Sequence, residues 1–168
     1  MAEEATLANQ FAQSFRSEHR AIRDALFGLA QAFEKKSSTD IDTSLNTVAS
    51  LTGPHFRYEE EALYPSLIGI FGEHYIGKLF SDHDRAIGAA KRISALAGSN
   101  HQTNEQVSEA VSLIRGILPH VSDCEGLSIM TETLPSSELA AILKARERAL
   151  QQGLDLLTWS SEIRDHRV

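Results

Sequence analysis

Residues 11–33 read FAQSFRSEHRAIRDALFGLAQAF, and the apolar side chains among them recur at steps of four and three positions. That spacing places them along one face of an α-helix, whereas a strand would need strict alternation. The shared face carries Phe11, Phe15, His19, Ile22, Leu26, Leu29 and Phe33. The segment therefore predicts a long amphipathic helix that buries one side.

Three further segments repeat this periodicity, and short runs of Ser, Thr, Asn and Gly separate them. They span residues 41–70, 76–97 and, with a less distinct end, 103–134. In the second of these, Pro54 and Pro65 are expected to bend the helix without ending it. Connections this short permit only antiparallel neighbours, so we expect an all-α fold, an up-down-up-down four-helix bundle.

A shorter fifth helix is predicted at residues 137–151, packed across one end of the bundle. The last residues, which include Trp159, Arg164 and His166, show no clear period and are assigned no role. The extra helix is thus the only predicted element after the four long ones.

The chain has 168 residues and neither a linker nor a low-complexity tract, so a single domain over 1–168 is expected. Its bundle core is placed at about residues 6–132 and its C-terminal helical extension at 136–168. With 16 basic and 23 acidic residues the net charge is -7, which disfavours nucleic acid and anionic lipid as partners.

No apolar run approaches the roughly 18 residues that a membrane span needs. The N-terminus lacks the basic start and apolar stretch of a secretory signal. The single cysteine, Cys124, suits a reducing compartment. These features together predict a cytoplasmic protein with no membrane partner.

Histidine is the informative residue type, because four of the seven histidines lie on apolar stripes, one on each long helix. They are His19, His55, His83 and His120. One buried imidazole is commonly satisfied by a carbonyl or a water. Four together, left unpaired, would each cost about 1–3 kcal/mol. A bound metal ion removes that cost, and we predict one where the four helices meet.

A carboxylate supports the same prediction. Glu59 follows His55 by four residues, so the two side chains lie one above the other on one helix face. Histidine with carboxylate suits iron, manganese or zinc rather than calcium. The neighbouring Glu60 and Glu61 are expected to face solvent. The closest general template is a bundle whose facing helices hold two metal ions bridged by carboxylates.

In the fourth helix, the spacing does not determine which residue joins His120 as a ligand. Four residues after His120 stands Cys124, while Asp123 and Glu125 stand three and five residues after it. Glu125 reaches the inner face only if the helix is underwound or bent at Pro119. From the residues alone, Glu125, Asp123 and Cys124 remain alternatives.

Taken together, these blocks resemble the hemerythrin-like family, also called the HHE cation-binding domain, over about residues 8–132. The resemblance rests on Glu18-His19-Arg20, on His55 to Pro65, on Asp82-His83-Asp84 and on His120 to Glu125. It implies a non-haem di-iron centre: two iron ions bridged by two carboxylates and an oxo or hydroxo group.

Carried over residue by residue, the resemblance implies terminal ligands and bridges. The terminal ligands would be His19, His55, His83 and His120, and the bridges would be Glu59 and Glu125. From the residues, Glu18 could accept from the second ring nitrogen of His19, and Asp82 or Asp84 from that of His83, and both pairs could equally be surface charges. Oxygen-carrying members have a further histidine where this chain has Leu79.

The function implied by the resemblance is binding or sensing of a small molecule such as oxygen or nitric oxide. The alternatives are a di-iron enzyme acting on peroxide or nitric oxide, at the coordination position that Leu79 leaves open, and an iron storage or repair protein. The sequence leaves open whether the protein is an enzyme.

Overall fold

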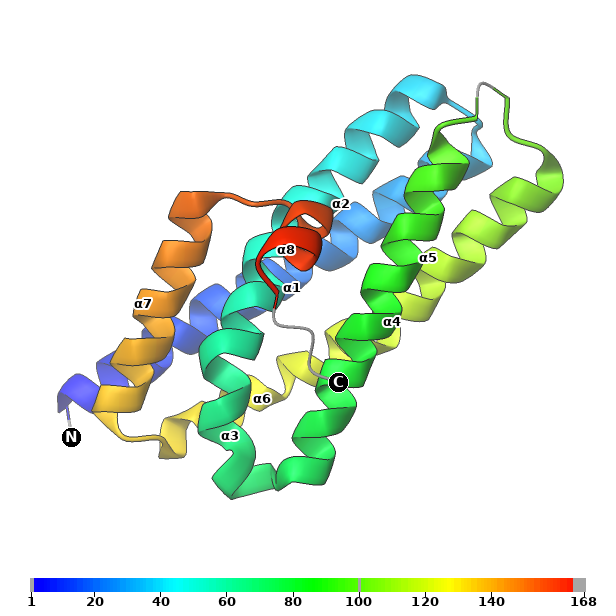
Figure 1. Cartoon of the computed structure of the whole chain (residues 1–168). Helices are drawn as coiled ribbons and strands as arrows, with labels where there is room; N and C mark the ends of the chain where they lie inside the picture. Colours follow the sequence, from blue (N-terminus) through cyan, green and yellow to red (C-terminus); the bar gives the residue numbers. More distant parts are fainter. Residues whose placement is uncertain (1, 100, 165–168) are drawn as a thin grey trace.

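The computed structural model describes residues 2–99 and 101–164, with side chains from residue 6 onward. Within these residues all regular secondary structure is helical, which confirms the all-α prediction. The long helices are α1 (Ala2–Glu34), α2 (Ser38–Tyr58), α4 (Glu73–Ala97) and α5 (Asn104–Glu125). They pack lengthwise, with α1 against α2 and α5 and with α4 against α5 (Figure 1).

The second helical segment is continuous from residue 38 to residue 71 but changes its pitch. After α2 comes a π-helical turn, η1 (Glu59–Leu63), and then α3 (Tyr64–Phe71). Pro54 lies inside α2, and Pro65 lies in the first turn of α3, directly after the π turn. As predicted, neither proline ends the segment.

Local signals fix where the other helices begin. The hydroxyl of Thr103 accepts from the backbone N–H of Gln106, whose side chain accepts from the Thr103 N–H in return, so a capping box starts α5. Gly72, with φ of 80°, separates α3 from α4 in a backbone conformation that residues other than glycine rarely adopt. The short connections keep successive helices adjacent.

Two apolar clusters divide the core, and the inward histidines lie where one cluster gives way to the other. Along α1, Phe11 and Phe15 belong to one cluster, and Ile22 and Leu26 belong to the other, with His19 between them. The same change occurs around His83 in α4 and around His120 in α5. The histidines therefore share one level of the bundle.

The chain after α5 forms four further elements, and each of them packs on at least one of the long helices. These are α6 (Leu127–Met130), the 3-10 turn η2 (Thr131–Thr133), α7 (Ser136–Gln152) and α8 (Leu156–Glu162). The expected extra helix, α7, lies alongside α1 and α2 rather than across one end, because Leu139 and Ile142 join the core cluster there (Figure 1).

Helix α8 was not predicted from the sequence. It packs on α2 and α4, and its Trp159 is buried in the core with 1% exposure. Gly53 of α2 allows this approach, since a Cβ atom there would lie 2.2 Å from the carbonyl oxygen of Leu154. His166 lies outside the described residues. None of the helices described here combines the length and the hydropathy needed to cross a membrane.

Candidate metal centre

The structure brings the four inward histidines into two pairs at one level of the bundle. All four are buried. The rings of His19 and His55 lie edge-on with centroids 4.5 Å apart, and those of His83 and His120 lie edge-on at 4.8 Å. One pair comes from α1 and α2, and the other from α4 and α5.

Glu59 lies between the two pairs and is fully buried. Its Oε1 atom is 3.4 Å from Nε2 of His55, and its Oε2 atom is 3.2 Å from Nε2 of His83. One carboxylate therefore faces both pairs with a different oxygen. This is the geometry that a bridging ligand would use.

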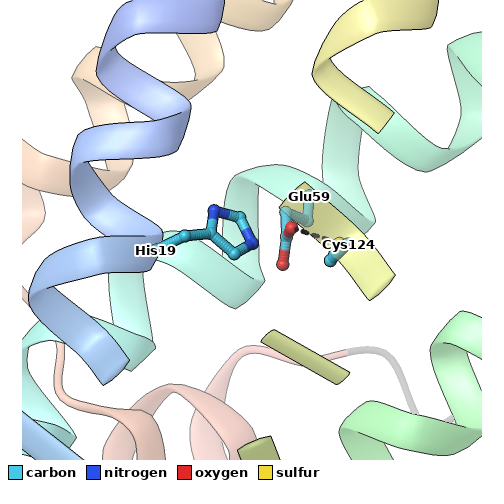
Figure 2. Close-up of side chains that lie close together, drawn as sticks. All are labelled: His19, Glu59 and Cys124. Carbon is cyan, nitrogen blue, oxygen red and sulfur yellow. Dashed lines mark hydrogen bonds between the residues drawn. The ribbon is translucent and has the colours of Figure 1, made fainter. Parts of the chain in front are cut away.

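Among the described residues, two overlapping groups of side chains can each hold a metal ion. The groups are His19 with Glu59 and Cys124, and Glu59 with His83 and His120. Within each group the donor atoms all lie within 4.8 Å of one another. Figure 2 shows the first group, with the His19 ring and the Cys124 side chain on opposite sides of the Glu59 carboxylate in this view. Two neighbouring cation positions would share Glu59.

Three of the imidazoles are held through Nδ1, which leaves Nε2 for the interior. His55 Nδ1–H donates to Glu18 Oε2, and His83 Nδ1–H donates to Glu60 Oε1, both at 2.8 Å. His19 Nδ1–H donates to the carbonyl of Phe15, also at 2.8 Å.

These partners differ from those suggested by the sequence. Glu18 holds His55 rather than His19, because its carboxylate reaches across to α2, where the Tyr58 hydroxyl also donates to it at 2.7 Å. Asp82 pairs with Arg85 and lies 3.6 Å from His120 Nδ1 instead of holding His83. Asp84 is bound by Arg164 at 2.6 Å.

The expectation that Glu60 faces solvent was wrong, since it is only 7% exposed. The π turn that starts at Glu59 is the reason: its wider helical path carries two consecutive glutamates to the buried side, while Glu61 stays exposed. Hydrophobic periodicity could not reveal this, because it assumes an α-helical pitch. The run of three glutamates was the only local signal.

Of the three alternatives on the fourth helix, the structure places Cys124 beside Glu59. The thiol is fully buried and donates to Glu59 Oε1 at 2.9 Å. Glu125 is about one-third exposed, with Oε2 3.6 Å from Arg23, and Asp123 lies 3.7 Å from Lys78 at the surface. The expected second bridge, Glu125, is therefore not brought to the other ligands.

The physical reason is that α5 remains a regular α-helix to Glu125. The residue four positions after His120 then faces inward, and the residue five positions after it faces away. The underwound turn that Glu125 would have needed occurs in the second helical segment instead.

The charges around Glu59 separate the histidines into two kinds. Burial, assisted by the nearby charge of His55, lowers the pKa of His19 to about 4, and burial next to His83 likewise lowers that of His120 to about 4. Burial opposes the charged form of His55 as well, but Glu59 and Glu18 outweigh it and raise its pKa to about 9. His19 and His120 thus keep neutral lone pairs.

Two buried polar atoms of the candidate groups lack a hydrogen-bond partner. Glu59 Oε2 and His120 Nδ1 are buried and have no hydrogen-bond partner of suitable geometry in the described chain. Such atoms cost about 1–3 kcal/mol each when nothing satisfies them. Imidazole, carboxylate and thiol donors suit iron, manganese or zinc. The residues present therefore fit a metal centre.

A model of the family described as the hemerythrin HHE cation binding domain matches residues 10–127. This range includes all six ligands expected from the sequence, and Cys124 as well. It ends before α7 and α8 begin. The comparisons with curated proteins and with solved structures gave no match.

Proposed function

We propose, because the chain belongs to the hemerythrin HHE cation binding domain family, that it holds two iron ions and binds or senses a small molecule such as oxygen or nitric oxide. The four long helices would form the up-down-up-down bundle that presents the ligands. The observation that carries the proposal is Glu59, which faces a histidine pair with each of its two oxygens. Bound iron would supply an open coordination position and one-electron chemistry.

The proposed ligands divide between two ions. One ion would take His19, His55 and Cys124, the other would take His83 and His120, and Glu59 would bridge them. The hydrogen bonds to Glu18 and Glu60 hold His55 and His83 in the tautomer with Nε2 free for a metal. These residues orient the donors before any metal arrives.

Cys124 makes the two proposed positions chemically different. Its sulfur lies 2.9 Å from Glu59 Oε1 on the side of the first position, and a cysteine ligand binds as thiolate, which is softer than an oxygen ligand. The Tyr64 hydroxyl lies 3.4 Å from Sγ and 3.0 Å from His83 Nε2, so it contacts ligands of both ions.

A surface cavity reaches the second position. It has a volume of about 300 Å³, lies between α4 and α5, and is lined by His120, Asp82, Lys78 and Arg85, among others. Because His120 forms part of its wall, a small molecule in this cavity would be next to a proposed ligand. The volume is at the lower end of the range found for small-molecule pockets, so the cavity could admit a small molecule to this position.

One observation favours the alternative, an enzyme acting on peroxide or nitric oxide. Tyr64 places an O–H group beside the proposed ligands His83 and Cys124, within a fully buried site. Groups of this kind can deliver protons to a small bound molecule.

Metal analysis and gas uptake test the proposal. We expect about two iron ions per chain, and reversible oxygen release under vacuum by the reduced protein if it is a carrier or sensor. Irreversible oxidation with turnover of peroxide or nitric oxide would favour the enzyme. Absence of bound iron after reconstitution would overturn the proposal, and His74→Ala, on the exposed start of α4, is the matched control that should keep its iron.

The role of Cys124 is tested separately. In Cys124→Ser, we expect loss of the thiolate-to-metal charge-transfer absorption while His83 and His120 still hold one ion. A spectrum identical to that of the unmodified protein would mean that the sulfur is not a ligand.

A further inference from the structure

The C-terminal extension, which lies outside the family match, contacts the proposed centre through an arginine on α7. Arg146 places both Nε and Nη2 2.5 Å from Glu18 Oε1. The other oxygen of the same carboxylate accepts from His55 Nδ1 at 2.8 Å. Arg146, Glu18 and His55 thus form a hydrogen-bonded chain that ends on a proposed ligand.

A second arginine repeats this arrangement on the other histidine pair. Arg164, which follows α8, donates from Nε and Nη2 to the two oxygens of Glu60, each at 2.9 Å. Glu60 Oε1 accepts from His83 Nδ1 at 2.8 Å. The Arg164 side chain is 12% exposed, so this contact is largely shielded from solvent.

The two hydrogen-bonded series end on equivalent histidines of the site. Each ends on the histidine whose Nε2 faces an oxygen of Glu59, and each starts from the extension formed by residues 136–164. Each carboxylate carries one arginine and one imidazole. Leu139, Ile142 and Trp159 also attach the extension, because they bury its apolar side.

An ordinary surface pair on the same helix shows the contrast. Arg148 lies 4.0 Å from Glu61, which is about one-third exposed, and the arginine itself is 57% exposed. Such a pair contributes little to stability. Arg146, two residues earlier, is 25% exposed and bonds to a carboxylate that orients a ligand.

Hydrogen bonding to a carboxylate makes a metal-bound imidazole a stronger electron donor, which favours the more oxidised metal. A guanidinium bound to that carboxylate draws its negative charge away through charge-assisted bonds and weakens the effect. We propose that Arg146 and Arg164 are positioning residues through which the extension raises the reduction potential of the centre. The inference rests on the proposed function, since it needs a redox-active metal on His55 and His83.

The test is the midpoint potential of the iron-loaded full chain, with iron content measured in every variant. Arg146→Gln and Arg164→Gln should each lower the potential, and the double variant should lower it further. Arg146→Lys and Arg164→Lys should restore part of the shift. Arg148→Gln is the matched control and should leave the potential unchanged.

Neutralising either carboxylate should shift the midpoint potential in the opposite direction. Glu18→Gln and Glu60→Gln should raise the potential, because the imidazoles lose a negative acceptor. General loosening of the fold would not produce opposite shifts in the two sets, so the result stays decisive even if one variant folds poorly.

The two failures can be told apart. If the unmodified protein takes up no iron, the proposed function fails and takes this inference with it. If iron is bound and the glutamine variants keep the unmodified potential, the inference alone is overturned, and the arginines serve only to fasten the extension.

Discussion

Two helical segments carry the same short pattern of a proline, an inward histidine and acidic residues further on, yet they place it differently. In the second segment, Pro54 and His55 precede Glu59 and Glu60, and both glutamates are buried. In α5, Pro119 and His120 precede Cys124 and Glu125, of which only the cysteine is buried. The first segment contains a π turn after its histidine, whereas α5 continues as a regular helix.

The surroundings of Glu60 and Glu125 explain why only Glu60 is buried. A buried carboxylate must be matched by donors or cations. Glu60 meets His83 and Arg164, the latter supplied by the C-terminal extension. Glu125 instead lies at the surface near Arg23. The comparison teaches that an acidic residue five positions after a histidine enters the core only where another part of the fold can neutralise it.

The largest expected effect separates Glu59 from Glu125. Glu59→Gln should remove most of the bound metal, because this carboxylate belongs to both candidate groups. Glu125→Gln should keep the metal, since its side chain lies outside both groups. Metal content after reconstitution and desalting measures the difference. Similar losses in the two variants would contradict the assignment of α5.

The equivalent histidines of the two segments should titrate far apart in chelator-treated protein. Two-dimensional NMR of the imidazoles should find His55 charged up to about pH 9, beside Glu59 and Glu18, and His120 neutral down to about pH 4, because it is buried next to His83. Similar titration midpoints for His55 and His120 would contradict the electrostatic difference between the two segments.

The pKa shifts of His55 and His120 should also make the stability of the metal-free protein depend on pH, in opposite directions. The raised pKa of His55 stabilises the fold fully below 6.5, and this contribution is lost as pH rises from 6.5 to about 9. The lowered pKa of His120 acts the other way, and its contribution is lost as pH falls from 6.5 to about 4. Urea unfolding of the metal-free protein across this range would show whether stability declines on both sides.

The smallest expected effect is on stability, and it depends on what packs against a glycine in each segment. Gly53→Ala should destabilise the protein by about 1–3 kcal/mol, because the added Cβ would meet the backbone between α7 and α8. Gly116→Ala in α5 has nothing within 4 Å and should stabilise by about 0.4–1 kcal/mol. Urea midpoints measure both, and changes of the same sign would mean that the extension does not press on α2.

The sequence by itself determined the helical class and the inward face of each long helix. His19, His55, His83 and His120 were placed correctly on buried faces because α-helical periodicity relates each residue to others on its own helix. Glu59 was placed by the same rule, four residues after His55. The family resemblance was likewise contained in local blocks, and the match over residues 10–127 confirmed it.

Only the tertiary structure decided what lies opposite those faces. Periodicity assumes a constant pitch, so it could not place Glu60, which a π turn carries inward, or choose Cys124 over Glu125. It also says nothing of contacts between distant segments, such as that of Arg164 with Glu60, 104 positions earlier. The pairing of a buried charge depends on packing of the whole chain, and helical spacing carries no information about it.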